Sequence, residues 1–525
     1  MMKNLLLLLL LIFPFTVRAQ WGVDTDDDNF APSTKVTFTE TNLPLVFLNV
    51  EGKTIQKDSY ILATMKVIDN GDGHNYRDTT AYPNQTVNFE GYAAVKYRGN
   101  SSFYNSKKKP LAIRPLETND VSGKKKKVVM LGMGKKGDNN WVMLAPWEDK
   151  TYSRDLLTFI LAKPYMDYVP QGKFCELILD GTYYGIYILC EKVSKGKDRL
   201  NLNDPGEDGS LTGDYHIEID RDDEDHYYTS KYHPLDGNGN ELTNKTITYQ
   251  YDDPEYEDFM DEEFYAAYPN ALDTLHALID QMENAFASDD YTNSETGYRK
   301  YIDVTSFIDY ELSTEFTNNI DGYRLSTHMY KYSVPRAAKK GWDSRWKMTL
   351  WDFNIAYGNA SYYKPNDNVW RYEANEYMYN ADNQLVPFFW SRLMADESYV
   401  KELKSRWREY RSGSYTETNI TNTIDSLVSV LQANDAVTRD NKAWSYHFGS
   451  LSSNVTTLKN FITKRLKFMD AALLDDESTS IHATTAANRE VQAIYSIDGL
   501  RLPNLQRGVN LVRYSDGKVS KVLIK

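Results

Sequence analysis

The chain has 525 residues, of which 41% are hydrophobic, 13% are aromatic and 26% are charged. A chain of that length can bury a large core, and its formal net charge of −14 argues against nonspecific binding to nucleic acid. No zinc-finger or other nucleic-acid-binding signature occurs. Its 40 tyrosines and 10 tryptophans leave a glycan contact open, although aromatic side chains also fill the cores of many large folds.

The first residues have the pattern of a secretory signal peptide. A short basic start is followed by an apolar core over 5–15, and Ala19 provides a cleavage site. No later stretch approaches about 18 uninterrupted apolar residues, so no transmembrane segment is expected, and no cysteine follows the core for lipid attachment. We expect a signal peptide over 1–19, a polar linker over 20–34, and a mature protein that is secreted or held at the cell surface.

The next part of the chain, up to about Arg114, alternates like strands. The expected strands cover 45–50, 60–68 and 92–97. A basic cluster then stands out against the acidic whole. Lys108 and Lys109 open a further apolar strand, so one of the two should point inward.

A helix over 150–163 and a hairpin over 174–193 are expected next. The chain has two cysteines, Cys175 and Cys190, and both fall in this hairpin. A regular hairpin register places them too far apart for a disulfide, whereas a bulge would allow one. We favour free thiols.

A strand is expected over 215–220, and the acidic, tyrosine-rich stretch 222–263 is interpreted as a long insertion over one face. Helical periodicity follows over 271–287, 304–318, 387–394, 397–410, 418–434 and 455–474. Strands come first and helices later, which is the order of an α+β domain with a strand-rich N-terminal part and a helix-rich C-terminal part.

The last segment differs in composition. Residues 475–490 form a linker rich in Ser, Thr and Ala, and residues 491–525 hold short alternating strands with Asp-Gly turns. About 35 residues cannot build much core alone. We therefore expect a small C-terminal β appendage.

Two acidic residues in the middle of the chain, Asp321 and Asp352, stand among apolar and aromatic neighbours. A carboxylate there is costly unless it is paired or holds a cation. Asp352 ends a run that alternates like a strand, so it and Asn354 would point to one side and present their oxygens together. Such donors suit Mg²⁺ or Mn²⁺ carrying a nucleotide phosphate. A turn, a cap or an ion pair with Arg324 are the structural alternatives.

Several motifs in one order resemble the CotH kinase family, which comprises secreted or spore-coat proteins. The resemblance covers residues 35–474 and implies a two-lobed atypical protein-kinase-like fold. The motifs that carry it are Arg98-Gly99-Asn100-Ser101-Ser102, Lys108-Lys109-Pro110, Asp180-Gly181-Thr182-Tyr183-Tyr184-Gly185-Ile186-Tyr187 with Glu191, Asp321 with Tyr330, and Trp351-Asp352-x-Asn354 ending at Gly358.

The resemblance implies catalytic and metal-binding roles for four residues. Asp352 would bind the metal, and Asp321 would be the carboxylate that accepts or orients the substrate hydroxyl proton. The sequence departs from the family pattern at Asn354, where Asp is common, and at Ser326, where many members have Asn. Both residues still offer oxygen donors to the metal, with less charge or weaker ligation.

The resemblance also implies a nucleotide pocket. Lys108 or Lys109 would contact the phosphates of ATP, with Glu191 as an acidic partner. Arg98 and Asn100 would shape the pocket.

The expected function is that of an exported atypical kinase, which transfers the γ-phosphoryl group of ATP to a hydroxyl of a secreted or surface protein with Mg²⁺ or Mn²⁺. Because of Asn354 and Ser326, a catalytically weak pseudokinase or surface scaffold on the same fold is the alternative. A third hypothesis is a glycan-active protein, in which Asp321 and Asp352 would be the carboxylate pair of a hydrolase. The C-terminal segment resembles a short sorting domain of secreted Bacteroidetes proteins, which implies a Bacteroidetes-type family member.

Overall fold

The computed structural model has both helices and strands, which confirms the expected α+β class. The residues that it describes are 31–222, 226–362, 368–378, 382–445, 449–474, 491–496, 501–502, 504–506, 508–514 and 519–524. The expected signal peptide and the linker over 475–490 lie outside these residues. Among the described residues, no helix is long and apolar enough to cross a membrane.

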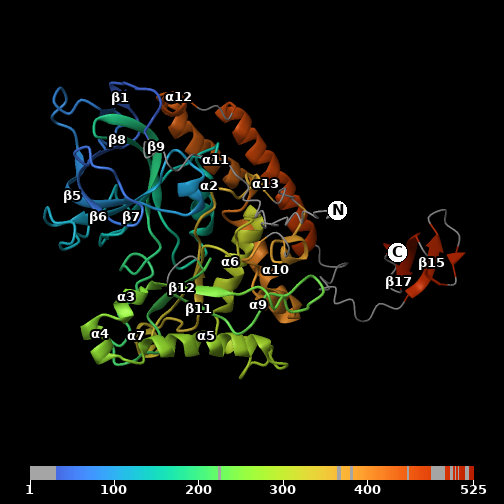
Figure 1. The fold of residues 1–525 in the computed structure, drawn as a ribbon. Coiled ribbons are helices and arrows are strands. Elements are labelled where there is room, and N and C mark those ends of the chain that lie inside the picture. Colours follow the sequence, from blue (N-terminus) through green and yellow to red (C-terminus); the bar gives the residue numbers. More distant parts are fainter. Residues whose placement is uncertain are drawn as a thin grey trace, which may run out of the picture.

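Seven strands of the first part of the chain close into a barrel (Figure 1). In order around the barrel they are β2 (Leu45–Asn49), β3 (Ile61–Ile68), β5 (Val87–Tyr97), β6 (Leu111–Leu116), β7 (Trp141–Leu144), β9 (Thr182–Glu191) and β8 (Gly172–Leu179). The strands expected in this region are present. The closure was not foreseen, because it depends on parallel pairing of β2 with β8, in which Val46 lies opposite Leu177.

The hairpin of β8 and β9 is confirmed, with a bulge between Leu177 and Ile178. Cys175 lies opposite Tyr187, and Cys190 lies opposite Gly172. Both thiols are buried and free, which confirms the expectation of no disulfide.

A five-stranded antiparallel sheet follows. Its order is β11 (Tyr227–Thr229), β12 (Thr248–Asp253), β10 (Tyr215–Ile219), β13 (Thr327–Lys331) and β14 (Lys347–Thr349). The interpretation of 222–263 as an insertion over one face is therefore wrong. The polar composition hid a strand in which Tyr249 is fully buried opposite Ile219.

Helices cover the sheet and the adjoining side of the barrel (Figure 1). The long ones are α2 (Arg154–Ala162), α5 (Ala271–Ala287), α6 (Val304–Thr317), α9 (Phe388–Ala395), α10 (Glu397–Ser412), α11 (Glu417–Gln432), α12 (Ala436–Trp444) and α13 (Leu451–Leu473). All but α12 agree with the expected helices. Helix α6 lies innermost and packs against α2, α10, α13 and β14, so twelve of its side chains are buried.

Shorter elements connect these parts. They are β1 (Glu40–Thr41), β4 (Asn75–Tyr76), α1 (Ser101–Tyr104), α3 (Tyr256–Phe259), α4 (Glu262–Ala267), η1 (Tyr298–Lys300), α7 (Val334–Lys340) and α8 (Asn375–Met378). The C-terminal segment forms a separate antiparallel sheet in the order β16 (Arg501–Leu502), β15 (Val491–Ser496), β17 (Gly508–Tyr514) and β18 (Val519–Ile524).

Candidate active site

The loop after α6 carries Asp321. Asn318 caps the helix in the left-handed conformation with φ 50°, which Asn adopts more readily than most residues. Asp321 is half-buried, and its Oδ1 lies 2.7 Å from Nη2 of Arg324. The Tyr362 hydroxyl donates a hydrogen bond to the same oxygen at 3.2 Å. The ion pair with Arg324 that the sequence left open is thus present.

Glu315, in the last turn of α6, fixes where this loop starts. The backbone N–H of Arg371 donates to its Oε2 at 2.8 Å, and the Tyr323 hydroxyl donates to its Oε1 at 2.8 Å. Arg465 pairs with it at 2.9 Å. A buried carboxylate with this many partners stabilises the loop rather than offering a binding site.

The second loop carries Asp352. Strand β14 ends at Thr349, and Asp352 has φ 59°, so the strand geometry assumed for Asp352 and Asn354 is wrong. The loop is held to the first one because Asn319 Nδ2 donates to the backbone oxygen of Asp352 at 3.1 Å. The backbone oxygen of Asn354 accepts a hydrogen bond from Asn359 Nδ2 at 2.9 Å.

Four acidic side chains lie within electrostatic influence of one another here, and we name Glu148, Asp220, Asp321 and Asp352 the carboxylate cluster. Burial raises the pKa of Asp352 to about 6, and the charges of Asp321 and Asp220 add to this rise. Burial and the charges of Asp352 and Asp321 raise the pKa of Glu148 to about 7. Burial is the larger cause of both shifts, and the like charges add to it, so buried and mutually repelling carboxylates make this the electrostatic setting of a cation site.

A fifth acid, Asp155, contacts the backbone of the loop that carries Asp352. It is buried in α2, and its Oδ1 accepts a hydrogen bond from the N–H of Phe353 at 2.7 Å. Burial, followed by the charge of Asp352, raises the pKa of Asp155 to about 8. Asp155 therefore positions the Asp352 loop through this hydrogen bond.

Asp220 follows β10 and is held by Ser326. The N–H of Ser326 donates to Asp220 Oδ2 at 3.1 Å, and its hydroxyl donates to the same oxygen at 3.4 Å. Ser326 has φ 47°, a backbone conformation that Asn would also tolerate. The residue predicted as a metal ligand thus orients a carboxylate of the cluster in this structure.

Two arginines lower the electrostatic cost of the cluster. Arg98 lies over the ring of Trp351 at 5.5 Å, and its charge lowers the pKa of Asp352 against the effect of burial. Arg221 lies 3.5 Å from Asp220 and acts on Asp352 and Asp321 in the same sense. Together with Arg324, which pairs with Asp321 at 2.7 Å, they place positive charge beside the carboxylates.

The family model described as CotH kinase protein matches residues 95–469, well over half of the chain. The chain belongs to the CotH kinase family. No curated protein matches it. The matched span contains all four acids of the cluster and begins near the end of β5, so β2 and β3 of the barrel lie outside it.

Within this CotH chain, the structure places Lys108 away from the cluster. Its side chain is fully buried, and Nζ lies 2.6 Å from Oδ1 of Asp440 in α12. It also lies 5.1 Å from the centre of the Tyr187 ring. Gly185 leaves room for the Asp440 carboxylate beside β9, because a Cβ at this position would meet Asp440 Oδ1 at 1.8 Å. Lys108 joins the barrel to α12 and has no exposed surface for a phosphate in this arrangement.

Lys109 also points elsewhere. It lies 4.5 Å from the centre of the Phe103 ring and donates to the Phe103 carbonyl. It lines a small pocket with Leu111 and Tyr187 of the barrel, and burial lowers its pKa to about 8.

Glu191 and Asn100 complete the predicted nucleotide residues. Glu191 ends β9 and accepts a hydrogen bond from the N–H of Gln171 at 2.9 Å. Burial raises its pKa, and the charge of Arg199 opposes this. Asn100 precedes the short helix α1. Of the predicted nucleotide-binding residues, Arg98 is the one whose charge reaches the cluster.

Sequence reasoning missed Glu148, Asp155 and Asp220. For Asp220 a signal was present, because His216, Glu218 and Asp220 alternate along one strand and so share one face. Glu148 and Asp155 stand in no periodic pattern of acids. Tertiary packing of the β7–α2 connection on the Asp352 loop brings them to the site.

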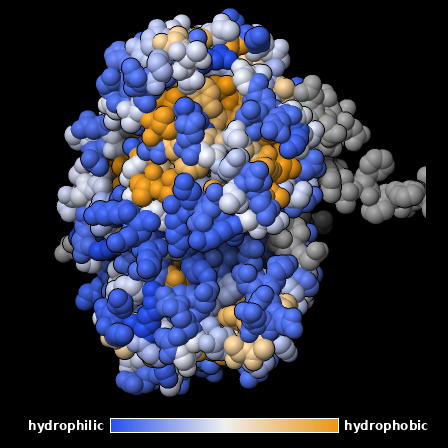
Figure 2. Space-filling model, turned by 90° about the vertical axis from the view of Figure 1, so that its left-hand side faces the viewer, coloured by the Kyte–Doolittle hydropathy of each residue, from blue (hydrophilic) through white to orange (hydrophobic). Residues whose placement is uncertain are grey.

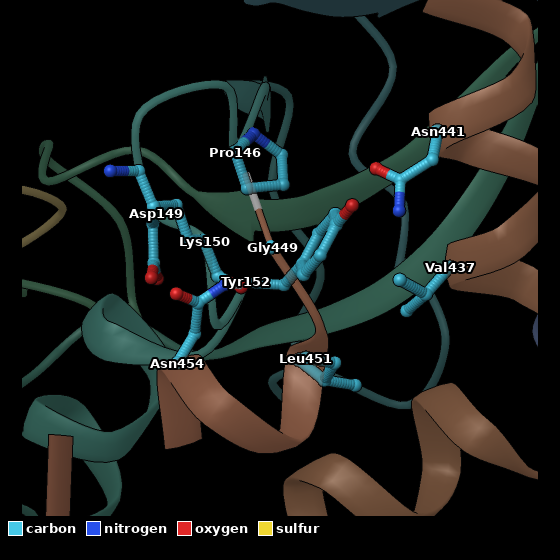
Figure 3. Close-up of a pocket in the computed structure, with 9 residues that line it drawn as sticks. All are labelled: Pro146, Asp149, Lys150, Tyr152, Val437, Asn441, Gly449, Leu451 and Asn454. Atoms are coloured by element: carbon cyan, nitrogen blue, oxygen red, sulfur yellow. Dashed lines mark hydrogen bonds between the residues drawn. The ribbon is translucent and has the colours of Figure 1, made fainter. Parts of the chain in front are cut away.

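Figure 2 shows hydrophobic surface over the barrel in the upper half and a hydrophilic band across the middle of the same face. A small pocket lies on another side of the β7–α2 connection, between this connection, α12 and the start of α13 (Figure 3). Its lining residues are Pro146, Asp149, Lys150, Tyr152, Val437, Asn441, Gly449, Leu451 and Asn454. No acid of the carboxylate cluster is among them.

Proposed function

We propose that this protein is an exported atypical kinase that transfers the γ-phosphoryl group of ATP to a hydroxyl of a secreted or surface protein, with Mg²⁺ or Mn²⁺. The observation that carries the proposal is the carboxylate cluster, in which burial and mutual repulsion raise the pKa values of Asp352 and Glu148. A divalent cation would relieve that repulsion. Family membership supports the same reaction.

The donor chemistry fits a hard cation. Asp352, Asp220 and Glu148 offer carboxylate oxygens, which Mg²⁺ and Mn²⁺ prefer. When bound, the cation would neutralise charge on the phosphates of the nucleotide. Asn354 remains a candidate amide donor beside this set.

Asp321 would orient the acceptor hydroxyl and receive its proton. Arg324 at 2.7 Å and the Tyr362 hydroxyl at 3.2 Å both contact Oδ1 and hold the carboxylate in place. Such positioning supplies much of the rate enhancement in phosphoryl transfer, where little covalent chemistry falls to the protein.

The cluster also supports a two-lobed, kinase-like arrangement. Arg98 and Glu148 follow strands of the barrel, whereas Asp321 and Asp352 come from loops of the helical part. We place the nucleotide between these two parts, with Arg98 and Arg221 facing its phosphates. The N-terminal signal pattern supports export, and the short C-terminal sheet supports a sorting role.

The test is transfer of labelled γ-phosphate by the mature protein, with Mg²⁺ and with Mn²⁺, to a generic acceptor and to itself. The parent is compared with Asp352→Ala and with Asp290→Ala, which removes an exposed acid. Label incorporated by the parent and by Asp290→Ala, and lost in Asp352→Ala, is expected. Absence of transfer together with absence of metal-dependent nucleotide binding would leave a pseudokinase or scaffold.

A further inference from the structure

A second group of polar side chains lies in the five-stranded sheet, and the kinase reaction does not use it. His216 is on β10, Asp252 is on β12 and His328 is on β13, so neighbouring strands supply all three. We name these three residues the His–His–Asp cluster. The two imidazoles are almost completely buried, with 1% and 3% of their surface exposed.

The three donor atoms form a triangle of the size that a tetrahedral metal needs. His216 Nε2 lies 3.0 Å from His328 Nδ1. Asp252 Oδ2 lies 3.4 Å from His216 Nε2 and 3.3 Å from His328 Nδ1. A tetrahedral ion with bonds of about 2.0–2.1 Å separates its ligand atoms by about 3.3 Å.

The cluster also contains polar atoms that the protein does not satisfy. Asp252 Oδ2 and His328 Nε2 are buried, and neither has a hydrogen-bond partner. Buried polar atoms are seldom left in this state, because they have lost their contact with water without a replacement. An ion at the centre of the triangle would engage the orphaned oxygen directly.

The surroundings resemble the outer shell of a metal site. Asp253 Oδ2 lies 3.0 Å from His216 Nδ1, the ring nitrogen that faces away from the triangle. Glu218 Oε1 lies 3.8 Å from His328 Nε2, also outside the triangle. A carboxylate on the outer nitrogen fixes the tautomer of a ligating histidine and raises its basicity.

A hydrogen-bonded chain from Asp253 through His216 to His328 is the structural alternative. It accounts for the contacts at 3.0 Å on either side of His216. It does not account for Asp252, whose Oδ2 lies 3.4 Å from His216 Nε2 and 3.3 Å from His328 Nδ1 and so faces both inner ring nitrogens at once. The position of Asp252 Oδ2 beside both rings therefore favours a metal site over a hydrogen-bonded chain.

We propose that His216, His328 and Asp252 bind one zinc-class divalent ion in a tetrahedral site, with the fourth position open to water. Two imidazoles and one carboxylate favour Zn²⁺ or Co²⁺ over Mg²⁺, so this site is chemically distinct from the carboxylate cluster. The two sites are linked through β10, which carries His216 and Glu218 and is followed directly by Asp220. An ion joining β10, β12 and β13 would stiffen the strand that positions Asp220.

The test uses the whole mature protein, stripped with a chelator and titrated with Zn²⁺ and with Co²⁺. We expect one Zn²⁺ per chain, a rise in Tm on binding, and the intense visible absorption of four-coordinate Co²⁺. Asp252→Asn, which keeps the shape of the side chain, should weaken binding at least tenfold, as should His328→Gln. Asp290→Asn and Asp352→Asn should leave Zn²⁺ binding unchanged.

Two results would overturn the proposal. One is a folded, stripped parent protein that takes up no Zn²⁺. The other is Zn²⁺ uptake by a folded Asp252→Asn or His328→Gln protein with the affinity and Co²⁺ spectrum of the parent. The use of two variants covers the case in which one of them fails to fold.

Discussion

Buried charge occurs in two contrasting regions of this molecule. Where the barrel meets α12, Asp440 Oδ1 accepts from Lys108 and from the N–H of Ile186, and Oδ2 accepts from the Tyr152 hydroxyl. In the carboxylate cluster, burial and like charges instead raise the pKa of Asp352 to about 6. Balanced buried charge fixes structure, and unbalanced buried charge marks a place where a cation is expected.

The largest expected effect comes from Asp321, in the carboxylate cluster. Asp321→Asn should lower the rate of γ-phosphoryl transfer at least ~100-fold, because the group that receives the hydroxyl proton is lost. Nucleotide affinity should stay within a few-fold of the parent. Single-turnover transfer and equilibrium binding of ATP, measured side by side, check both statements. Equal transfer rates in the variant and the parent would show that Asp321 takes no part in the reaction.

The balanced side should respond through stability. Lys108→Met or Asp440→Leu leaves one buried charge unpaired and should lower the free energy of unfolding by about 3–5 kcal/mol. The double variant should recover much of that loss. Chemical denaturation of the three variants checks this prediction. A Lys108→Met protein that keeps the stability of the parent but no longer transfers the γ-phosphoryl group would instead support a phosphate-binding role for Lys108.

The pH dependence of stability offers an intermediate effect. Burial is the first cause of the raised pKa values of Glu148, about 7, and Asp155, about 8. The folded state therefore holds protons that the unfolded state loses near pH 4, and these groups make stability fall as pH rises from about 4 to 8. In chelator, the Tm of Glu148→Gln should rise relative to the parent between about pH 5 and 7, the interval that ends at the folded pKa of Glu148. A difference in Tm that does not change with pH would contradict the raised pKa.

The smallest expected effect comes from Ser326→Asn. Asn tolerates the positive φ of this position, so the free energy of unfolding should change by less than about 0.5 kcal/mol. The added amide oxygen should lower the Mn²⁺ concentration needed for half-maximal transfer a few-fold. A higher requirement for Mn²⁺ would show that Ser326 matters through its hydrogen bonds to Asp220.

The sequence predicts the regular elements well and their assembly poorly. Helices α5 and α6 follow from clear 3.6-residue periodicity, and the β8–β9 hairpin follows from its Asp-Gly turn. Strand β12 was hidden by acidic composition. Helix α12 was missed because it is short and polar on one side. Barrel closure depends on pairing between β2 and β8, which are far apart in the chain and give no local signal.

The same limit applies to the site. Asp321 and Asp352 stand out because each is acidic within an apolar segment, and they do share one cluster. The inference that Asp352 lies in a strand failed because the residue adopts φ 59°, which no alternation pattern reveals. The sequence also contains no indication that Lys108 lies away from the carboxylate cluster, for a different reason. Its partner Asp440 is 332 residues away in the sequence.

The most direct test of the account is binding of Mn²⁺ with ATP at pH 7.5 to protein first saturated with Zn²⁺. Calorimetry on the parent, Asp352→Asn and Asp290→Asn isolates the carboxylate cluster from the His–His–Asp cluster. The account predicts metal-dependent ATP binding in the parent and in Asp290→Asn, and at least tenfold weaker binding in Asp352→Asn. Equal Mn²⁺-dependent binding in all three proteins would contradict the claim that the unbalanced carboxylates hold the cation.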